Sequence, residues 1–356
     1  MAADRATRVL IVDDSAIVRK LIGDALRREP DIEVIGGAAD PYVARDMILQ
    51  HRPDVITLDI EMPRMDGLSF LRRLMEHQPI PAIVVSSLTS AGSAASIEAL
   101  RIGAIDVVAK PGGPQSVGQV TDRIVRRIRA LRREPRVTFK PPAAAGAAPS
   151  AAVGGTLEAT AARARGLIVI GASTGGTQAL ETVLTRLPAD SPPVMVVQHM
   201  PAGFTRAFAE RLNTVCAMRV VEMASPGPVQ RGTVYIAPGD YHLTVHQAGI
   251  QLKGQLSQGP AVHYQRPAVD VLFASTARLK SLSVVGLLLT GMGADGMVAL
   301  RQAGAITIAE AEESCVVFGM PKEAIARGGA VHVATLLQMP ALIFESFERL
   351  SKKQAS

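Results

Sequence analysis

The amino-acid sequence predicts an α/β protein made of two doubly wound domains, the first with five βα units and the second with a mostly parallel sheet. Short apolar runs alternate with helical patterns along most of the chain, which is typical of parallel strands covered by helices. A segment rich in Ala, Pro and Gly separates two such regions. With 356 residues, the chain is long enough for two hydrophobic cores.

The first region, predicted as a domain over residues 1–138, contains five apolar runs of the kind found in strands buried on both faces. These runs are Val9–Val12, Val34–Ile35, Val55–Leu58, Ala82–Val85 and Ile105–Val108. Helical patterns lie between them, so we expect a five-stranded parallel sheet. In such a sheet functional side chains gather outside the carboxyl ends of the strands.

Residues 139–164 are predicted to form a flexible linker. Pro, Gly, Ala and Ser dominate this segment, and Val153 and Leu157 are its only large apolar side chains after residue 140. A stretch of this composition cannot form a core of its own, so it is typical of a connection between domains.

The second domain is predicted over residues 165–350 and starts in the same way as the first. An apolar run is followed by a tight turn, GASTGG, and then by a helical pattern after Thr177. The Gly- and Pro-rich stretch over 225–267 is compatible with antiparallel strands. The parallel strands are expected at Leu167–Ile170, Val194–Val197, Val234–Ile236 and Val284–Leu289.

The net charge of +6 raises the question of nucleic-acid binding. Six arginines cluster between residues 123 and 133, where apolar residues recur at helical spacing, so we expect these arginines to cover the solvated face of an amphipathic helix. Aromatic residues make up only 3% of the chain, which disfavours stacking on single-stranded nucleic acid. No nucleic-acid partner is therefore expected.

Neither a membrane span nor a signal peptide is expected. No apolar stretch approaches the roughly 20 residues that a membrane helix needs, and the chain runs from MAADRATR straight into a predicted strand. Two cysteines are too few for a disulfide framework or a zinc site. These features predict a cytoplasmic protein without membrane insertion.

Three carboxylates follow strands of the first domain, Asp13 and Asp14 after the first strand and Asp59 after the third. Carboxylates brought together repel one another, so the cluster favours a bound cation, and oxygen ligands of this kind suit Mg²⁺. Ser86 and Lys110 follow the fourth and fifth strands, where a hydroxyl and an ammonium can bind phosphoryl oxygens. An Asp at a strand end is often only a helix N-cap, and Asp14 or Ser15 can serve that role. Five such residues together indicate a site.

The motifs VDDS, LDIEMPRMDG, VVSS and AKP resemble those of the response-regulator receiver domain over residues 7–133. The resemblance implies that Asp59 accepts a phosphoryl group from a histidine kinase, and that other residues hold Mg²⁺ or contact the phosphoryl group. The implied Mg²⁺ ligands are Asp13, Asp14, Asp59 and the backbone carbonyl of Glu61, and the implied phosphoryl contacts are Ser86 and Lys110.

The segment GASTGG contains G-x-S-x-G, with Ser173 between a predicted strand and a predicted helix. Small residues at such a turn let a serine hydroxyl project from the sheet, and the amides that follow can meet an oxyanion. A glycine-rich turn at a helix N-terminus can equally bind a phosphate. The motif alone leaves these two interpretations equally supported.

A histidine and an aspartate favour the serine nucleophile. His199 is the one of seven histidines that ends a buried strand, in VMVVQHMP, although a lone histidine there is more often a cap or core residue. A further strand, SVVGLLLT, runs into GMGADG and brings Asp295 to the same edge. A nucleophile, a base and a group that orients the base are then available together. The order Ser–His–Asp differs from that of α/β-hydrolases, so the ordinary lipase fold is not expected.

The segments GASTGG, QHMPAGFT, YIAPGDYH, RPAVDVLF, LLTGMGADG and ESCVVFGMP are similar to those of the protein-glutamate methylesterases of bacterial chemotaxis, over residues 165–345. The resemblance implies a catalytic triad of Ser173, His199 and Asp295, with no cofactor in the esterase site. It also implies that backbone amides near Thr174 and Met292 form the oxyanion site.

The same resemblance implies what the enzyme acts on. The substrates are methyl esters of glutamates on the cytoplasmic helices of chemoreceptors, from which methanol is released, and selected receptor glutamines, which are deamidated. Residues 263–265 bear on receptor preference if they line the substrate cleft. The unphosphorylated receiver domain is implied to cover the Ser173 crevice and to leave it when Asp59 is phosphorylated.

Two rival functions make different demands on the sequence. A DNA-binding regulator needs a basic recognition helix in a helix-turn-helix. The second domain consists instead largely of predicted strands that are followed by Gly-rich segments. A nucleotide-binding site at GASTGG needs a Walker lysine or an acidic ribose partner, and neither stands in a suitable place. The sequence therefore favours an esterase regulated by phosphorylation.

Overall fold

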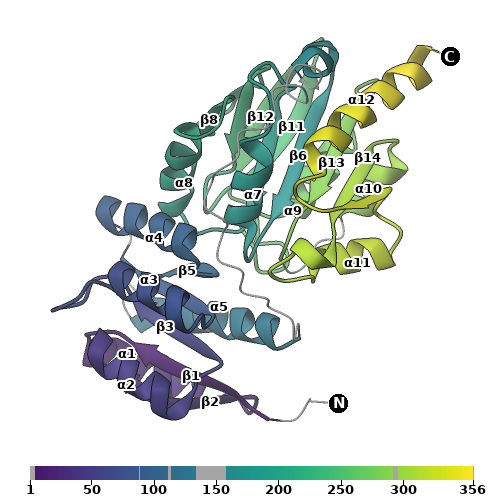
Figure 1. Cartoon of the computed structure of the whole chain (residues 1–356). Helices are drawn as coiled ribbons and strands as arrows, with labels where there is room; N and C mark the ends of the chain where they lie inside the picture. Colours follow the sequence, from purple (N-terminus) through teal and green to yellow (C-terminus); the bar gives the residue numbers. More distant parts are fainter. Residues whose placement is uncertain (1–4, 88, 111–113, 134–157, 292–295, 356) are drawn as a thin grey trace. The chain divides into compact units, whose positions relative to one another are not determined.

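The computed structural model describes residues 5–87, 89–110, 114–133, 158–291 and 296–355. The chain forms two compact units that divide near residue 144 (Figure 1). Among the described residues, no helix combines the length and the apolar character that a bilayer crossing requires.

The first unit contains one five-stranded parallel sheet in the order β2-β1-β3-β4-β5. Its strands are β1 (Thr7–Val12), β2 (Ile32–Ala38), β3 (Val55–Asp59), β4 (Ala82–Ser86) and β5 (Asp106–Ala109). Its helices are α1 (Ala16–Leu26), α2 (Pro41–His51), α3 (Gly67–His77), α4 (Ser90–Ile102) and α5 (Pro114–Arg133). The predicted doubly wound fold is confirmed, and every predicted strand of this unit overlaps an observed one.

Local sequence signals set where these helices begin. The side chains of Ser15, Asp40, Asp66 and Thr89 each accept a hydrogen bond from a backbone amide in the first turn of the helix that follows. Such caps satisfy amides that have no partner within the helix. Each of these helices therefore starts after a short loop that follows the preceding strand, and the strand ends are left open for a site.

The prediction that the arginines of α5 lie on a solvated face is wrong for part of the cluster. Arg127 is buried and forms an ion pair with Asp106 at the start of β5. Arg129 binds Glu29 and Asp31, with nitrogen–oxygen distances of 2.6 and 2.7 Å. Helical spacing identifies the face that packs on the sheet, but it does not reveal the carboxylates that neighbouring elements offer to the helix.

The second unit is built on a seven-stranded parallel sheet in the order β15-β14-β13-β6-β7-β10-β8, with helices on both faces (Figure 1). The strands that carry the predicted site lie at its centre, in the order β13, β6, β7. The strands are β6 (Leu167–Ala172), β7 (Val194–Gln198), β8 (Arg219–Glu222), β10 (Thr233–Ile236), β13 (Val284–Leu288), β14 (Ile306–Glu310) and β15 (His332–Ala334).

A small antiparallel sheet in the order β11-β12-β9 adds to this unit. Its strands, β9 (Gly227–Pro228), β11 (His242–Ala248) and β12 (Gln251–Ser257), lie within the stretch in which antiparallel pairing was expected. The remaining elements are α7 (Gly176–Leu184), α8 (Phe204–Asn213), α9 (Val269–Thr276), α10 (Gly296–Gln302), η1 (Glu312–Ser314), α11 (Met320–Ala326) and α12 (Met339–Ala355).

The predicted linker over 139–164 falls mostly outside the described residues, but its last part differs from a flexible connection. Residues 158–163 are helical, and the side chain of Ala161 is fully buried. Arg231 donates hydrogen bonds to the carbonyl oxygens of Ala161 and Ala164 and forms an ion pair with Asp190. Composition gave no sign of this anchor, because an arginine 67 residues further along the chain supplies it.

Candidate functional site

The predicted phosphorylation pocket lies at the carboxyl edge of the first sheet. Asp13 follows β1, Asp59 is the last residue of β3, Ser86 is the last of β4, and Lys110 follows β5. One carboxylate oxygen from each of Asp13, Asp14 and Asp59 is available to a cation, and these three oxygens lie within 4.8 Å of one another. The strand order β1-β3-β4-β5 is what brings the residues together.

Lys110 compensates part of the negative charge. Its Nζ lies 2.6 Å from Asp59 Oδ2 and 3.7 Å from Asp13 Oδ2. Burial acts to lower the pKa of Lys110, but the hydrogen bond to Asp59 and the charges of both carboxylates raise it overall. The ammonium is therefore held in its charged form beside the predicted acceptor.

The carboxylates still carry an excess of charge. Burial, followed by the charge of Asp59, raises the pKa of Asp13 to about 6. Burial also raises the pKa of Asp59, and this effect exceeds the opposite effect of Lys110. The Oδ2 atom of Asp13 is buried without a hydrogen-bond partner among the described residues. A divalent cation fits these observations, because it would give that oxygen a partner and relieve the repulsion.

Ser86 and Glu61 border this pocket. Ser86 is buried at the end of β4, and its Oγ donates to the carbonyl oxygen of Gly92 over 3.3 Å. The backbone N–H of Glu61 donates to Asp59 Oδ1 over 3.1 Å, and the Glu61 carboxylate accepts from Ser87 Oγ over 2.9 Å. These contacts hold the β3–α3 loop against the beginning of the β4–α4 connection.

The predicted nucleophile turn connects β6 to α7. Ser173 follows β6 directly, and Gly175, with φ of 77°, is the residue before the first turn of α7. A side chain at Gly175 would be strained, because an L-residue seldom adopts a positive φ. Ser173 and Thr174 are both buried. The glycines of GASTGG thus allow the sharp turn that places Ser173 at the strand end.

Neighbouring strands hold this turn from both sides. On the β7 side, the Gln198 side-chain amide donates to the Ser173 carbonyl oxygen over 2.8 Å, and the His199 backbone N–H donates to Ala172 over 3.0 Å. On the β13 side, the Ser173 backbone N–H donates to the Thr290 carbonyl oxygen over 3.0 Å. Ser173 and the buried His199 therefore stand at the ends of adjacent strands.

Two residues of the predicted site, Asp295 and Met292, lie outside the described residues. The residues on either side of that segment are described. Gly291 is so close to the predicted nucleophile that a Cβ added there would lie 2.2 Å from the Cβ of Ser173. The Gly296 backbone N–H donates to Asp270 Oδ1 over 2.6 Å. The chain thus enters the segment beside Ser173 and leaves it beside Asp270.

Glu310, which the sequence analysis missed, supports the nucleophile turn from behind. Its fully buried carboxylate accepts from the Thr290 backbone N–H over 2.7 Å and from Ser314 Oγ over 3.0 Å. Thr290 Oγ1 in turn donates to the Thr174 carbonyl oxygen over 2.9 Å. No ion pair of Glu310 is found within the described part of the chain, and burial raises its pKa to about 7. Its position at the end of β14 was the available signal.

The histidines differ in their surroundings. His263 is exposed, and its Nε2 lies 3.4 Å from Asp270 Oδ2. His199, by contrast, is buried at the end of β7 beside the nucleophile turn. Position therefore favours His199 over His263 as the base that serves Ser173.

Comparison with known proteins shows the family of the chain. The CheB methylesterase family model matches residues 168–343, and the response regulator receiver domain model matches residues 9–121. A protein-glutamate methylesterase/protein-glutamine glutaminase of Syntrophus aciditrophicus is 50% identical over 338 residues, which cover 92% of this chain and 96% of that protein. The chain belongs to the CheB methylesterase family.

Other members of the CheB methylesterase family match over similar lengths. A protein of the same description from Chromohalobacter salexigens is 46% identical over 353 residues, which cover 98% of each chain. Among solved structures, the catalytic domain of Thermotoga maritima CheB methylesterase is 37% identical, with a TM-score of 0.49, and covers 51% of this chain and 98% of its own. The relatives from Syntrophus aciditrophicus and Chromohalobacter salexigens match over nearly the whole chain, so their matches span both predicted regions.

Proposed function

We propose that the chain is a phosphorylation-regulated protein-glutamate methylesterase and protein-glutamine deamidase of bacterial chemotaxis. The observation that carries the proposal is the position of Ser173 and His199 at the ends of adjacent central strands, in a chain half identical to proteins of that description. Its substrates are methyl-esterified glutamates on the cytoplasmic helices of chemoreceptors and selected receptor glutamines. The site of action is then the cytoplasm.

The esterase mechanism assigns one role to each residue. Ser173 Oγ attacks the ester carbonyl while His199 takes the hydroxyl proton, and the imidazolium then gives that proton to departing methanol. Asp295 orients the imidazole and stabilises its charged form. Backbone amides near Thr174 and Met292 bind the oxyanion of the tetrahedral intermediate. No cofactor is needed for these steps.

Water completes the reaction. His199 removes a proton from water, which attacks the acyl-enzyme and releases the glutamate side chain from Ser173. A receptor glutamine passes through the same tetrahedral intermediate and leaves ammonia in place of methanol. The two activities therefore require only one site.

The first unit supplies the regulation. An oxygen of Asp59 attacks the phosphoryl group of a histidine kinase's phosphohistidine, and Lys110 and Ser86 contact the transferred group. Asp13, Asp14, Asp59 and the carbonyl of Glu61 would hold Mg²⁺, which neutralises the charge of the phosphoryl oxygens when it is bound. Residues 1–138 form the receiver domain, residues 165–350 form the catalytic domain, and the segment between them connects the two.

The test is methanol release from membranes that contain methylated chemoreceptors, measured with and without acetyl phosphate. We expect release by the resting chain and faster release after phosphorylation. A chain that releases no methanol in either condition, yet shifts a DNA duplex or binds a nucleotide, would support one of the rival functions instead.

A further inference from the structure

An exposed turn beside the esterase site is held in an unusual backbone conformation. Val262 and Gln265 pair as a two-residue hairpin, with N–H to carbonyl distances of 2.9 and 3.1 Å in the two directions. The two residues at the tip, His263 and Tyr264, have φ values of 50° and 62°. A hairpin turn with two positive φ angles normally contains Asn and Gly, because larger side chains are strained there. Here the tip carries two ring side chains.

The surrounding structure holds this turn rigidly. Arg266 binds Asp240 Oδ1 through its Nε over 2.9 Å and donates to the Gly259 carbonyl oxygen over 3.0 Å. The His242 ring hydrogen-bonds the Pro260 carbonyl oxygen over 3.0 Å. Pro260 is therefore held to His242 of β11, and Arg266 to Asp240 just before β11, so hydrogen bonds fix the chain on both sides of the turn.

The turn is connected to the esterase site by short contacts. His263 Nε2 lies 3.4 Å from Asp270 Oδ2, and the other oxygen of Asp270 accepts from the Gly296 backbone N–H over 2.6 Å. Val269, which precedes Asp270, packs closely on β6. A Cβ added at Gly171 of this strand would lie 2.3 Å from Val269 Cγ1. The turn thus stands at the edge of the site.

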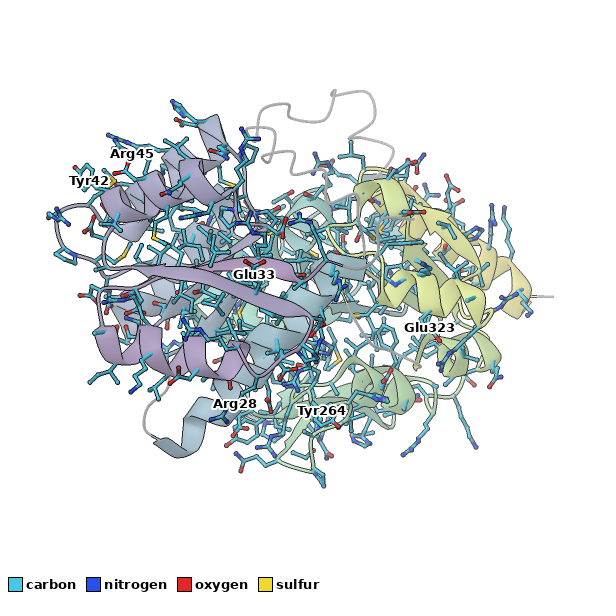
Figure 2. The ribbon with its side chains drawn as sticks, turned by 90° about the horizontal axis from the view of Figure 1, so that it is seen from below. Arg28, Glu33, Tyr42, Arg45, Tyr264 and Glu323 are labelled. Carbon is cyan, nitrogen blue, oxygen red and sulfur yellow. The ribbon has the colours of Figure 1, made fainter. Side chains whose placement is uncertain are left out.

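The side chain of Tyr264, labelled in Figure 2, is 78% exposed. A strained turn that presents a large aromatic ring to solvent adds nothing to the core of this unit. Strain of this kind persists mainly at functional positions. Aromatic residues held by a rigid backbone are also the usual anchors of protein recognition, because little side-chain entropy is lost on binding.

We propose that the 262–265 turn recognises the protein substrate, with Tyr264 packing against the receptor helix next to the modified glutamate. The Tyr264 ring contacts the surface of the receptor helix and does not contact the carbonyl group that Ser173 attacks. A small ester cannot reach the turn, so Tyr264 contributes to the reaction of the receptor and not to the chemistry itself. The inference rests on the proposed esterase function.

The test uses the full-length chain with Tyr264→Gly and two substrates. Glycine adopts a positive φ without strain, so this variant keeps the turn and should unfold at the same temperature as the parent or higher. We expect kcat/KM on methylated receptor membranes to fall by about tenfold, as for loss of an interface anchor. Hydrolysis of the γ-methyl ester of an N-acetylglutamate amide should stay within about twofold of the parent.

Two further variants serve as controls. Tyr264→Phe keeps the ring and should retain most of the activity on the receptor. Ile250→Ser removes an exposed apolar side chain from the β11–β12 turn of the same unit and should leave both substrates unaffected.

The outcomes separate this inference from the proposed function. If the parent chain releases methanol and Tyr264→Gly acts on the receptor at the same rate, the recognition role is wrong and the esterase function stands. Equal losses on the receptor and on the small ester would assign the turn to the chemistry and overturn the proposal. If Tyr264→Gly raised the activity of the unphosphorylated chain on both substrates, the turn would have a regulatory role, and this result would also overturn the proposal. A parent chain that hydrolyses neither ester would contradict the esterase function itself.

Discussion

Replacing Glu310 by Gln should make the second unit more stable at neutral pH, and the gain should disappear in acid. The Glu310 carboxylate is fully buried, accepts its hydrogen bonds from Thr290 and Ser314, and has a pKa raised to about 7. Glutamine resembles the protonated acid, since it keeps a carbonyl oxygen for the Thr290 amide and removes the charge. The substitution therefore isolates the cost of ionising a buried carboxylate.

The magnitude follows from the two pKa values. Glutamate titrates at 4.5 in the unfolded chain and at about 7 in the folded one. Between these values the folded state holds a proton that the unfolded state has lost, so stability falls as the pH rises through this window. At about 1.4 kcal/mol per pKa unit, the difference between the two pKa values makes the full cost well above pH 7 about 3 to 4 kcal/mol. The variant avoids this cost.

The assay is chemical unfolding of parent and variant from pH 5 to pH 8. The chain contains no tryptophan, so far-UV circular dichroism is the suitable signal. We expect the variant's advantage in unfolding free energy to grow by about 2 to 3 kcal/mol across this range. The carboxylates of the first unit titrate alike in both proteins, so they cancel in the difference.

Glu312→Gln is the matched control, because this exposed glutamate lies two residues away from Glu310. It should leave the pH dependence unchanged. A difference between Glu310→Gln and the parent that stays constant from pH 5 to pH 8 would refute the reasoning, since it would mean that the pKa of Glu310 is the same in the folded and the unfolded state.

Three further predictions concern activity and regulation. Ser173→Ala should reduce methanol release at least about a thousandfold while the fold is retained, and replacement of His199 should cost a similar amount because triad members act as a unit. His263→Ala should change the rate only modestly. Near-normal turnover in Ser173→Ala would exclude the serine mechanism. Acetyl phosphate with Mg²⁺ should add one acid-labile phosphoryl group, and labelling that persists in Asp59→Asn would place the acceptor elsewhere. Chelation of Mg²⁺ should block labelling without affecting the esterase activity of the unphosphorylated chain. A truncated chain that begins at residue 158 retains the buried Ala161. It should be more active than the resting full-length protein and should not respond to acetyl phosphate. Activity of the truncated chain no higher than that of the resting protein would favour activation by contacts from the receiver domain.

The central part of the fold could be predicted because its strands are buried on both faces. Strands such as β6 and β13 are apolar along their whole length, so they stand out from the helical patterns around them. The sequence analysis did not identify β8, β14 and β15. Of these, β14 is buried, whereas the edge strands β8 and β15 are short and partly exposed. Mixed polar and apolar residues at a sheet edge resemble an ordinary loop.

The candidate site shows a similar division. Ser173, His199 and Asp59 stand within three residues of the ends of apolar runs, where the topology of a parallel sheet places functional residues. Glu310 and Asp270 were missed as supporting residues, because their partners lie 20 and 26 residues away along the chain. A sequence pattern gives the strand that a residue follows, whereas these contacts depend on how neighbouring strand ends meet.

The close packing around the nucleophile limits where the specificity of this enzyme can change. Any side chain at Gly171 or Gly291 would collide with Val269 or with Ser173 itself, so selection in the laboratory should recover glycine at both positions. The tip of the 262–265 turn faces no such barrier, because the exposed ring of Tyr264 can be exchanged without repacking the core. A library directed at this turn would therefore retain far more folded, active members than one directed at the GASTGG segment, and it offers the practical route to an esterase with a new protein substrate.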